Sequence, residues 1–380
     1  DGTIIMTRRH RIYHRVSRGE PDHLLVALIG LFLIFGLVML SSASSVVSFK
    51  ELGSSYALVK HQLFFGVLPG AILFYFVSKV DYHVYRKIAP FLPILIIGLL
   101  IAVLIPGVGV VVNGARRWIS VAGKISFQPA EFVKLFLVLV LAWWFTLRAE
   151  HMRNFKRTVL PFIVFVGIIG GLIMQQPDFG TALIVGLIAA ALYFAAGAYW
   201  KHLAVLGITV LALAFMLIQI APYRMERITT FLNPENDPQG SGYHVQQAIL
   251  AVGSGGWLGL GLGHSRQKFA YLPEVHSDSI FAIIGEELGF VATTVVVILF
   301  LLLTFRIIRI ARRAPDGFGY LIGIGVASWI GFQAFINMGT MVKLIPLTGL
   351  PLPFISYGGT AMIATLVGLG IVVNISRQVR

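Results

Sequence analysis

Residues 24–44 read LLVALIGLFLIFGLVMLSSAS, without a charged side chain. A helix rises about 1.5 Å per residue, so a run of this length crosses the roughly 30 Å hydrocarbon core of a bilayer. The run follows a basic arm, 1–23, and it is too long for the apolar core of a cleavable signal peptide. We therefore predict that 24–44 is the first membrane span and that 1–23 is a cytoplasmic N-terminal arm.

Nine further stretches are also apolar and long enough to span a bilayer. Hydrophobic residues make up 57% of the chain and charged residues only 12%, whereas soluble domains carry about 25% charged residues. This composition excludes a soluble globule. We predict an all-α, polytopic membrane protein with about ten transmembrane helices in one membrane domain over 24–380. The further spans are expected at 57–78, 88–106, 130–148, 158–176, 179–198, 202–221, 279–305, 318–340 and 352–375.

The composition also excludes several kinds of site. Cysteine is absent, so disulfides, cysteine nucleophiles and thiolate metal sites are excluded. The formal net charge of +14 would suggest nucleic acid in a soluble protein, but here it is typical of loops that face an anionic leaflet. The glycines in 253–263 follow no predicted strand, so they do not indicate a dinucleotide site. We expect no nucleic-acid partner and no organic cofactor.

The orientation follows from lysine and arginine, which are enriched in cytoplasmic loops. With the N-terminus inside, 19 of the 30 Lys and Arg residues fall on the inner side of the predicted spans. The predicted outer segments hold acidic residues that include Asp178, Glu226, Glu235, Asp237, Glu274 and Asp278. We therefore expect both termini to be cytoplasmic and the chemistry to lie on the outer face.

Two predicted outer segments, 107–129 and 222–278, are longer than ordinary connections between packed helices. The second is a large extracytoplasmic loop between helices 7 and 8, and its scattered aromatic residues argue against disorder. Within it, 243–252 (YHVQQAILAV) has the pattern of a short amphipathic helix at the membrane interface.

The sequence YLPEVHSD places Glu274, His276 and Asp278 at the mouth of the eighth predicted span. A carboxylate at this boundary is partly desolvated, which strengthens its interactions with protons and cations. Asp278 is therefore a candidate general base or cation ligand, and Glu274 and His276 are candidate substrate-binding groups. The alternative is structural, because Ser277 or Asp278 could cap the span, and the spacing alone does not choose between these roles.

The other long outer segment carries a second group of polar residues. Arg116 and Arg117 can bind diphosphate oxygens in a bidentate manner, or they can act with Trp118 as a plain interfacial anchor. Glu131 and Lys134 stand at i and i+3 at the start of the fourth predicted span, so they can form an ion pair. That pair is either structural or part of a polar cavity.

Four more polar residues stand near or inside predicted spans. Asp178 begins the sixth span, where an acid favours the helix dipole, so a structural role is favoured. Glu286 and Glu287 lie inside the eighth span, where buried acids usually pair with something, and a structural role is again favoured. Lys343 precedes the Pro- and Gly-rich run 346–360, whose irregular backbone needs protein or a wet cavity beside it.

Together these motifs resemble the SEDS proteins (shape, elongation, division and sporulation), the FtsW and RodA group. The resemblance covers nearly the whole chain, and seven motifs occur in the family's order and at its spacing. They are EPDHLLVALIGLFLIFGLVMLSSAS (20–44), NGARRWI (113–119), FQPAEFVKL (127–135), QPDFGTA (176–182), FLNPENDPQGSGYHVQQA (231–248), YLPEVHSDSIFAIIGEELG (271–289) and PLPFISYGGT (351–360).

The resemblance implies ten helices and polymerisation of lipid II into peptidoglycan glycan strands at the outer face of the bacterial cytoplasmic (inner) membrane. A divalent cation, Mg²⁺ or Mn²⁺, is commonly linked to activity in the family. The usual partner is a class B penicillin-binding transpeptidase, together with other divisome membrane proteins. The family's essential aspartate matches Asp278, and its conserved polar positions match Arg116, Arg117, Glu131, Lys134 and Asp178.

Within the family, VNGARRWI, GLGHSRQKFAYLPE and IFAIIGEELG look like FtsW, whereas PLTGLPLPFISYGG is shared with RodA and with some FtsW proteins. An FtsW-like role in septal cell-wall synthesis is favoured over a RodA-like role in elongation. Ser279 departs from the aromatic residue that the family often has after the aspartate. Thr360 and Ala361 stand where Ser-Ser is common.

The implied mechanism is an inverting single displacement with Asp278 as general base or cation ligand. Two other classes remain open. A lipid II flippase would place ionisable residues near the bilayer midplane, whereas among the acids here only Glu286 and Glu287 lie deep in a predicted span. A division scaffold would bind partners through the large outer loop without doing chemistry.

Overall fold

The computed structural model describes residues 19–112, 114–121, 125–199, 201–202, 207, 229–234, 237, 240–269 and 271–379. Within these ranges eight helices are long and apolar enough to cross a membrane, and α8 (Phe179–Ala195) is apolar but shorter. These nine match nine of the ten predicted spans, so the chain is a multi-pass membrane protein. The predicted seventh span, 202–221, lies almost entirely outside the described residues.

Two of the spans each join two shorter α-helices, and the fifth begins with a π-helical turn, Phe155–Val159, that leads into α7 (Leu160–Met174). The second joins α2 (Ala57–Gln62) to α3 (Leu68–Val77) through a π-helical turn, and the third joins α4 (His83–Ile88) to α5 (Leu92–Leu104) through a 3₁₀ turn. Prolines stand in the first turns of α3 and α5, where a missing N–H is tolerated. The other long helices are α1 (His23–Leu52), α6 (Pro129–Leu147), α7 (Leu160–Met174), α12 (Ile280–Arg312), α13 (Gly317–Met341) and α14 (Gly359–Ser376).

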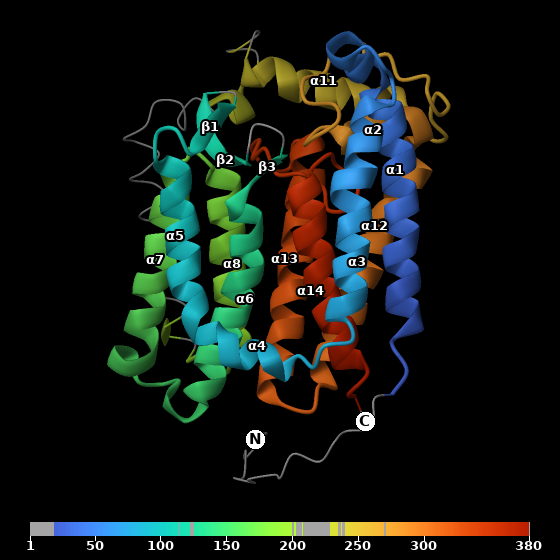
Figure 1. The fold of residues 1–380 in the computed structure, drawn as a ribbon. Helices are drawn as coiled ribbons and strands as arrows, with labels where there is room; N and C mark the ends of the chain where they lie inside the picture. The colour runs from blue at the N-terminus through green and yellow to red at the C-terminus, as the bar shows by residue number, and fades with distance from the viewer. Residues whose placement is uncertain are drawn as a thin grey trace.

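Three helices form the centre of the bundle. In their apolar windows 78% of α13, 72% of α14 and 67% of α6 is buried, against 28–39% for the other long helices. Figure 1 shows α13 and α14 in the middle of the bundle. Polar side chains on these central helices are surrounded by protein, so they must find hydrogen-bond partners there.

One end of the bundle carries a small antiparallel sheet in the order β1-β2-β3. Its strands are β1 (Gly109–Val112), β2 (Ala115–Val121) and β3 (Ile125–Phe127), and α11 (Ser241–Ser254) lies across the same end (Figure 1). We call this end the sheet end. The helix predicted at 243–252 is therefore confirmed, whereas the sheet within 107–129 was not predicted by the all-α assignment.

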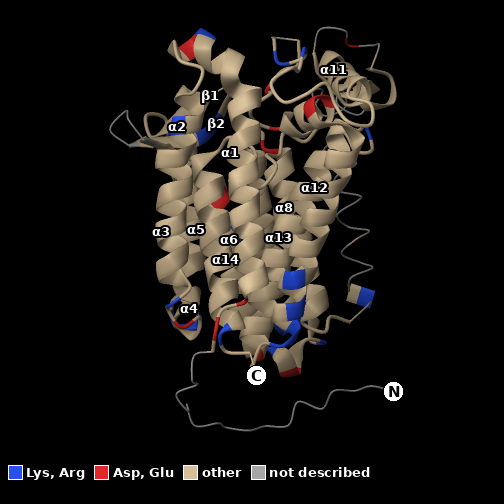
Figure 2. Ribbon diagram, turned by 90° about the vertical axis from the view of Figure 1, so that its right-hand side faces the viewer, with Lys and Arg blue, Asp and Glu red and all other residues tan. Residues whose placement is uncertain are grey.

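The described chain ends lie together at the opposite end of the bundle. Gly19 N donates to Arg377 O over 2.9 Å, which brings the start of the described chain beside its end (Figure 1). Charged residues gather mainly toward the two ends of the bundle, and the helices between them are largely uncharged (Figure 2). This distribution is what a bilayer-spanning bundle requires.

Candidate functional site

Asp278 lies in residues 271–279, the aspartate turn, which leads into α12 at the sheet end. Asp278 is only 9% exposed. The cap position of α12 is occupied by Ser279, whose side chain makes no capping hydrogen bond. The Ser279 hydroxyl instead lies 2.6 Å from His244 Nε2 of α11 and donates to Pro273 O over 2.8 Å. Ser279 therefore occupies the cap position, and the expectation that Ser277 or Asp278 caps the span is wrong.

The segment 342–358 between α13 and α14, here called the strap, holds the aspartate turn from one side. Ser356 Oγ donates to Ser277 O over 2.5 Å, and Tyr357 N donates to His276 O over 2.8 Å. The irregular backbone of the strap thus lies against protein, as predicted from its prolines and glycines. Backbone contacts of this kind fix where the aspartate turn sits relative to α14.

Burial disfavours the protonated form of the His276 imidazole. Burial lowers the pKa of His276 below its usual value, although the carboxylates of Glu274 and Glu51 act in the opposite direction. The His276 ring lies edge-on to the ring of Tyr357, with centroids 5.7 Å apart. A neutral imidazole can form a hydrogen bond but carries no positive charge, so His276 is not suited to pair with a phosphate group as a cation.

This depressed pKa makes the stability of the folded chain depend on pH. As the pH falls from about 7 through the ordinary histidine pKa of about 6.5, His276 takes up a proton more readily in the unfolded chain than in the folded chain. The unfolding free energy of the wild-type chain is therefore expected to fall over this window, and the His276→Gln variant should lose less unfolding free energy than the wild type. Thermal unfolding in detergent across the window measures both slopes, and equal slopes would contradict the expectation.

Glu131 and Lys134 form a buried ion pair at the start of α6. Their side chains are 4% and 0% exposed, and Lys134 Nζ lies 2.9 Å from Glu131. Lys134 Nζ also donates to Gln333 Oε1 over 2.8 Å and lies 5.3 Å from the ring centroid of Trp329. The pair predicted from i, i+3 spacing is present, and its enclosure inside the bundle favours the structural alternative.

Asp178 and Arg117 organise the turn between α7 and α8. The Asp178 carboxylate accepts hydrogen bonds from Thr181 N at 3.0 Å and Thr181 Oγ1 at 2.9 Å, so it caps α8. Arg117 of β2 donates from Nε to Gln176 O over 3.0 Å and from a terminal nitrogen to Pro177 O. The structure thus gives Asp178 the helix-terminal role that the sequence favoured, and it ties the sheet to α8.

The remaining predicted site residues lie apart from these contacts. Arg116 Nη1 is 3.5 Å from Leu104 O, at the edge of hydrogen-bond distance. Glu274 is exposed, and Lys343 is half-buried in the turn that follows α13. The structure therefore places His276 and Asp278 in one turn and connects Lys134 to the strap through Gln333. Glu274 is exposed, and Arg116 and Lys343 are partly buried.

Sequence reasoning missed the glycine loop (255–268), which packs against a break in α12. The break lies at Gly289, where φ is 76° and ψ is −174°. A break deprives neighbouring backbone groups of their helical partners, and the loop supplies replacements. Leu260 N donates to Glu286 O at 3.0 Å, Gly261 N to Glu287 O at 3.0 Å, Phe290 N to Gly256 O at 2.8 Å and Val291 N to Trp257 O at 3.2 Å.

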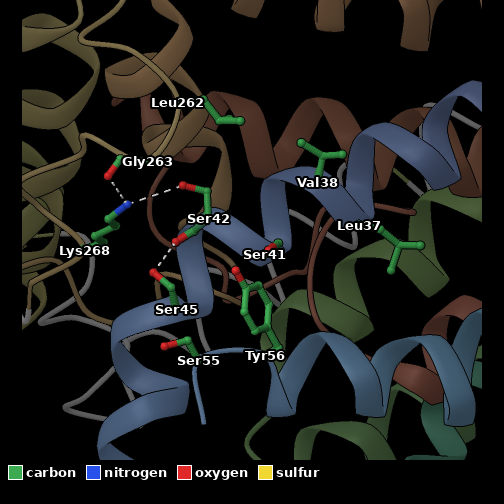
Figure 3. A pocket seen from close by; sticks show the side chains of 10 residues that line it. All are labelled: Leu37, Val38, Ser41, Ser42, Ser45, Ser55, Tyr56, Leu262, Gly263 and Lys268. Atoms are coloured by element: carbon green, nitrogen blue, oxygen red, sulfur yellow. Dashed lines mark hydrogen bonds between the residues drawn. The ribbon is translucent and has the colours of Figure 1, made fainter.

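The two buried acids of α12 hold the same glycine loop. Glu287 pairs with Lys268 at 3.1 Å and accepts a hydrogen bond from the Ser42 hydroxyl at 2.7 Å. Glu286 accepts a hydrogen bond from Arg266 N at 2.8 Å. The expectation that these acids pair is confirmed, and Figure 3 shows Lys268 and Ser42 at a cavity of about 590 Å³ between α1 and the loop.

Gly259 in the glycine loop combines a left-handed backbone conformation with a close backbone contact, so it cannot accept a side chain without strain. Its φ is 81°, and an added Cβ would stand 2.2 Å from Glu287 O. Gly259→Ala is expected to lower the unfolding free energy by about 2–4 kcal/mol through backbone strain and overpacking. The control is Gly253→Ala in α11, where an added Cβ meets nothing within 4 Å. Equal unfolding temperatures for the two variants would contradict this packing.

The described residues contain no group of three or more His, Asp or Glu side chains placed to hold a metal ion. Near Asp278, the Ser279 hydroxyl lies 3.4 Å from the carboxylate. Mg²⁺ is often bound by one or two carboxylates together with phosphate oxygens of a substrate. The donor set therefore fits Mg²⁺ or Mn²⁺ only when a phosphate-bearing substrate completes the coordination.

Comparison with known proteins places this geometry in a family. Residues 22–380 match the profile shared by FtsW, RodA and SpoVE and described as "Cell cycle protein". The chain belongs to the FtsW/RodA/SpoVE family. Stage V sporulation protein E of Bacillus subtilis (strain 168) is 43% identical over 364 residues, which cover 96% of this chain and 99% of that protein.

Further relatives of this family member agree with the FtsW-like expectation. A probable peptidoglycan glycosyltransferase FtsW of Geobacter sulfurreducens is 38% identical over 353 residues, covering 91% of this chain and 92% of that protein. A solved peptidoglycan synthase complex contains a chain with 31% identity and a TM-score of 0.79, covering 94% and 98%. The Thermus thermophilus rod shape determining protein RodA has 29% identity and a TM-score of 0.68, covering 94% and 97%.

Proposed function

We propose that this FtsW/RodA/SpoVE family member is a peptidoglycan glycosyltransferase that polymerises lipid II. The observation that carries the proposal is the placement of Asp278, an almost buried carboxylate at the end of the bundle remote from the described chain ends. His244 of α11, Asn337 of α13 and Ser356 of the strap each hydrogen-bond to the aspartate turn, which supports a preorganised carboxylate. The names of the Geobacter FtsW relative and of the peptidoglycan synthase complex support the same activity.

In this proposal Asp278 activates the acceptor. A sugar hydroxyl is a weak nucleophile near neutral pH, so the transfer needs a base within hydrogen-bond reach. Asp278 accepts the hydroxyl proton while the acceptor oxygen attacks the anomeric carbon of the donor, whose bond to the lipid diphosphate breaks. One displacement converts an α-linked donor into a β-linked product, so the reaction inverts the anomeric centre.

Arg116 and Arg117 of β2 are proposed to face the leaving diphosphate. Guanidinium groups stabilise negative charge that develops on phosphate oxygens, and both arginines are only partly buried. If Mg²⁺ or Mn²⁺ is bound, Asp278 would hold it and the cation would neutralise charge on the diphosphate. The site would be supported from within the bundle by Glu131, Lys134 and Asp178. Nearer the surface of the protein, the substrate is proposed to contact Glu274, His276 and Lys343.

The proposal extends to the cellular setting. We place the sheet end, with Asp278, on the outer face of the bacterial inner membrane and both termini in the cytoplasm. The arm 1–23 precedes a single membrane domain, 24–380, with outer segments 107–129 and 222–278. A class B penicillin-binding transpeptidase and other divisome proteins are the proposed partners in septal cell-wall synthesis.

Incubation of the purified chain with lipid II, with and without its transpeptidase, tests the proposed function. Glycan ladders on a gel are expected, and digestion by a muramidase should remove them. Movement of labelled lipid II between leaflets without ladders would instead identify a flippase. Partner binding with neither ladders nor lipid movement would identify a scaffold, and either result would overturn the proposal.

A further inference from the structure

Asn337 of α13 holds two backbone segments of the candidate site together. The residue is 0% exposed. Its Nδ2 donates to Asp278 O over 2.7 Å and to Leu350 O over 2.7 Å. One amide nitrogen carries two protons, so a single side chain satisfies both carbonyl groups. Asn337 thereby joins the aspartate turn to the strap at the residue that carries the proposed base.

The contacts of Asn337 also determine the orientation of its side-chain amide. Asn337 Oδ1 is buried and has no hydrogen-bond partner within the described part of the chain. The reversed amide would set this oxygen against two carbonyl oxygens, so the observed orientation follows from its surroundings. Asn337 donates two hydrogen bonds here. An aspartate at this position has the same shape, but its carboxylate oxygens would face the two backbone carbonyl oxygens, and none of these atoms can donate.

Gln333 continues the same arrangement one turn earlier on α13. Its Nε2 donates to Pro351 O over 2.8 Å, next to the strap residue that Asn337 holds. Its Oε1 accepts hydrogen bonds from Lys134 Nζ at 2.8 Å and from Trp329 Nε1 at 2.9 Å. Two successive turns of α13 therefore hold two consecutive strap residues. Lys134 of the buried pair in α6 orients the side-chain amide of Gln333.

We propose that Asn337 is a positioning residue for glycosyl transfer, which sets the Asp278 carboxylate against the strap while Gln333 holds the strap in place. This inference rests on the proposed function of Asp278. Asn337 is buried and acts through the backbone, so it affects the chemical step rather than substrate binding. A misplacement of a reacting group by about 1 Å lowers a rate on the order of 100-fold.

The primary test is Asn337→Asp, assayed for lipid II polymerisation relative to wild type across a range of pH. At neutral pH the introduced carboxylate repels both carbonyl oxygens, and kcat should fall on the order of 100-fold while KM changes little. Lowering the pH protonates the introduced group, and the acid form donates one hydrogen bond. The ratio of variant to wild-type activity should therefore rise as the pH falls, and a pH-independent ratio would overturn the proposal.

A second variant covers the case in which Asn337→Asp does not fold. Asn337→Ser keeps one hydroxyl donor and introduces no charge, and we expect kcat to fall at least about tenfold with little change in KM. The matched control is Asn374→Asp in α14, a buried amide at the opposite end that donates to Ser78 O over 3.1 Å. Its activity relative to wild type should not vary with pH.

The outcomes separate this inference from the proposed function. Wild-type protein that makes no glycan overturns the proposed function. Wild-type protein that polymerises lipid II while Asn337→Ser keeps both kcat and KM unchanged overturns only the role of Asn337. If Asn374→Asp shows the same rise in relative activity at low pH, the effect reports general destabilisation and the positioning role is rejected.

Discussion

Replacing Asp278 with asparagine is expected to lower the rate of lipid II polymerisation by about 10²–10⁴-fold, the contribution of a positioned general base. An amide of the same size cannot accept the hydroxyl proton at neutral pH. The aspartate turn should stay in place, because α13 holds it through the Asp278 backbone carbonyl rather than through the carboxylate. Gel quantification of glycan strands in the presence of the transpeptidase measures the loss.

The matched control for this variant is Glu51→Gln. Glu51 is an exposed carboxylate at the end of α1, and its amide variant changes the charge near the aspartate turn without touching it. We expect close to wild-type polymerisation from Glu51→Gln. An Asp278→Asn protein that folds and polymerises lipid II at the wild-type rate would refute the role of Asp278 as a base.

Replacing Lys134 with methionine is expected to lower the unfolding free energy by about 3–5 kcal/mol. The substitution leaves the Glu131 carboxylate buried without its cation, and it removes the donor that orients Gln333. Activity should fall with stability, because Gln333 supports the strap beside Asp278. Thermal unfolding in detergent, together with the polymerisation rate of the folded fraction, measures both effects.

The double substitution Glu131→Leu with Lys134→Met distinguishes an uncompensated charge from loss of the pair itself. Replacing both members of a buried pair with apolar residues is often neutral or stabilising, so the double variant should recover most of the lost stability. Glu20→Gln, at an exposed pair with His23, should have no measurable effect. A double variant as unstable as Lys134→Met alone would show that the pair contributes stability beyond mutual neutralisation.

Much of the membrane architecture follows from apolar run length, because each spanning helix must satisfy its own backbone groups in lipid. The same logic predicted that Glu286 and Glu287 have partners, since an unpaired buried acid is costly. It did not identify Lys268 as the partner of Glu287, because Lys268 lies in a loop whose conformation the sequence pattern does not predict. Gly289 inside an apolar span was the available signal, because a broken helix needs donors and acceptors from elsewhere.

The candidate site was predictable only as a set of motifs. Spacing predicted the Glu131–Lys134 pair because i and i+3 lie on one helix face. It could not predict that Gln333 connects this pair to the strap, or that Asn337 holds Asp278, because those contacts join segments distant in sequence. The sheet was missed because β1 has only four residues and β3 only three, and runs this short have no distinctive pattern.

The most direct test of the central claim is the side of the membrane on which polymerisation occurs. The chain is reconstituted into vesicles, which are sorted by protease access to a C-terminal tag, and lipid II is then added to the outer leaflet only. Glycan should form only in vesicles with a protected tag, because the sheet end and Asp278 then face the substrate. Equal polymerisation in both orientations, or polymerisation confined to vesicles with an exposed tag, would contradict a site around Asp278 at the sheet end.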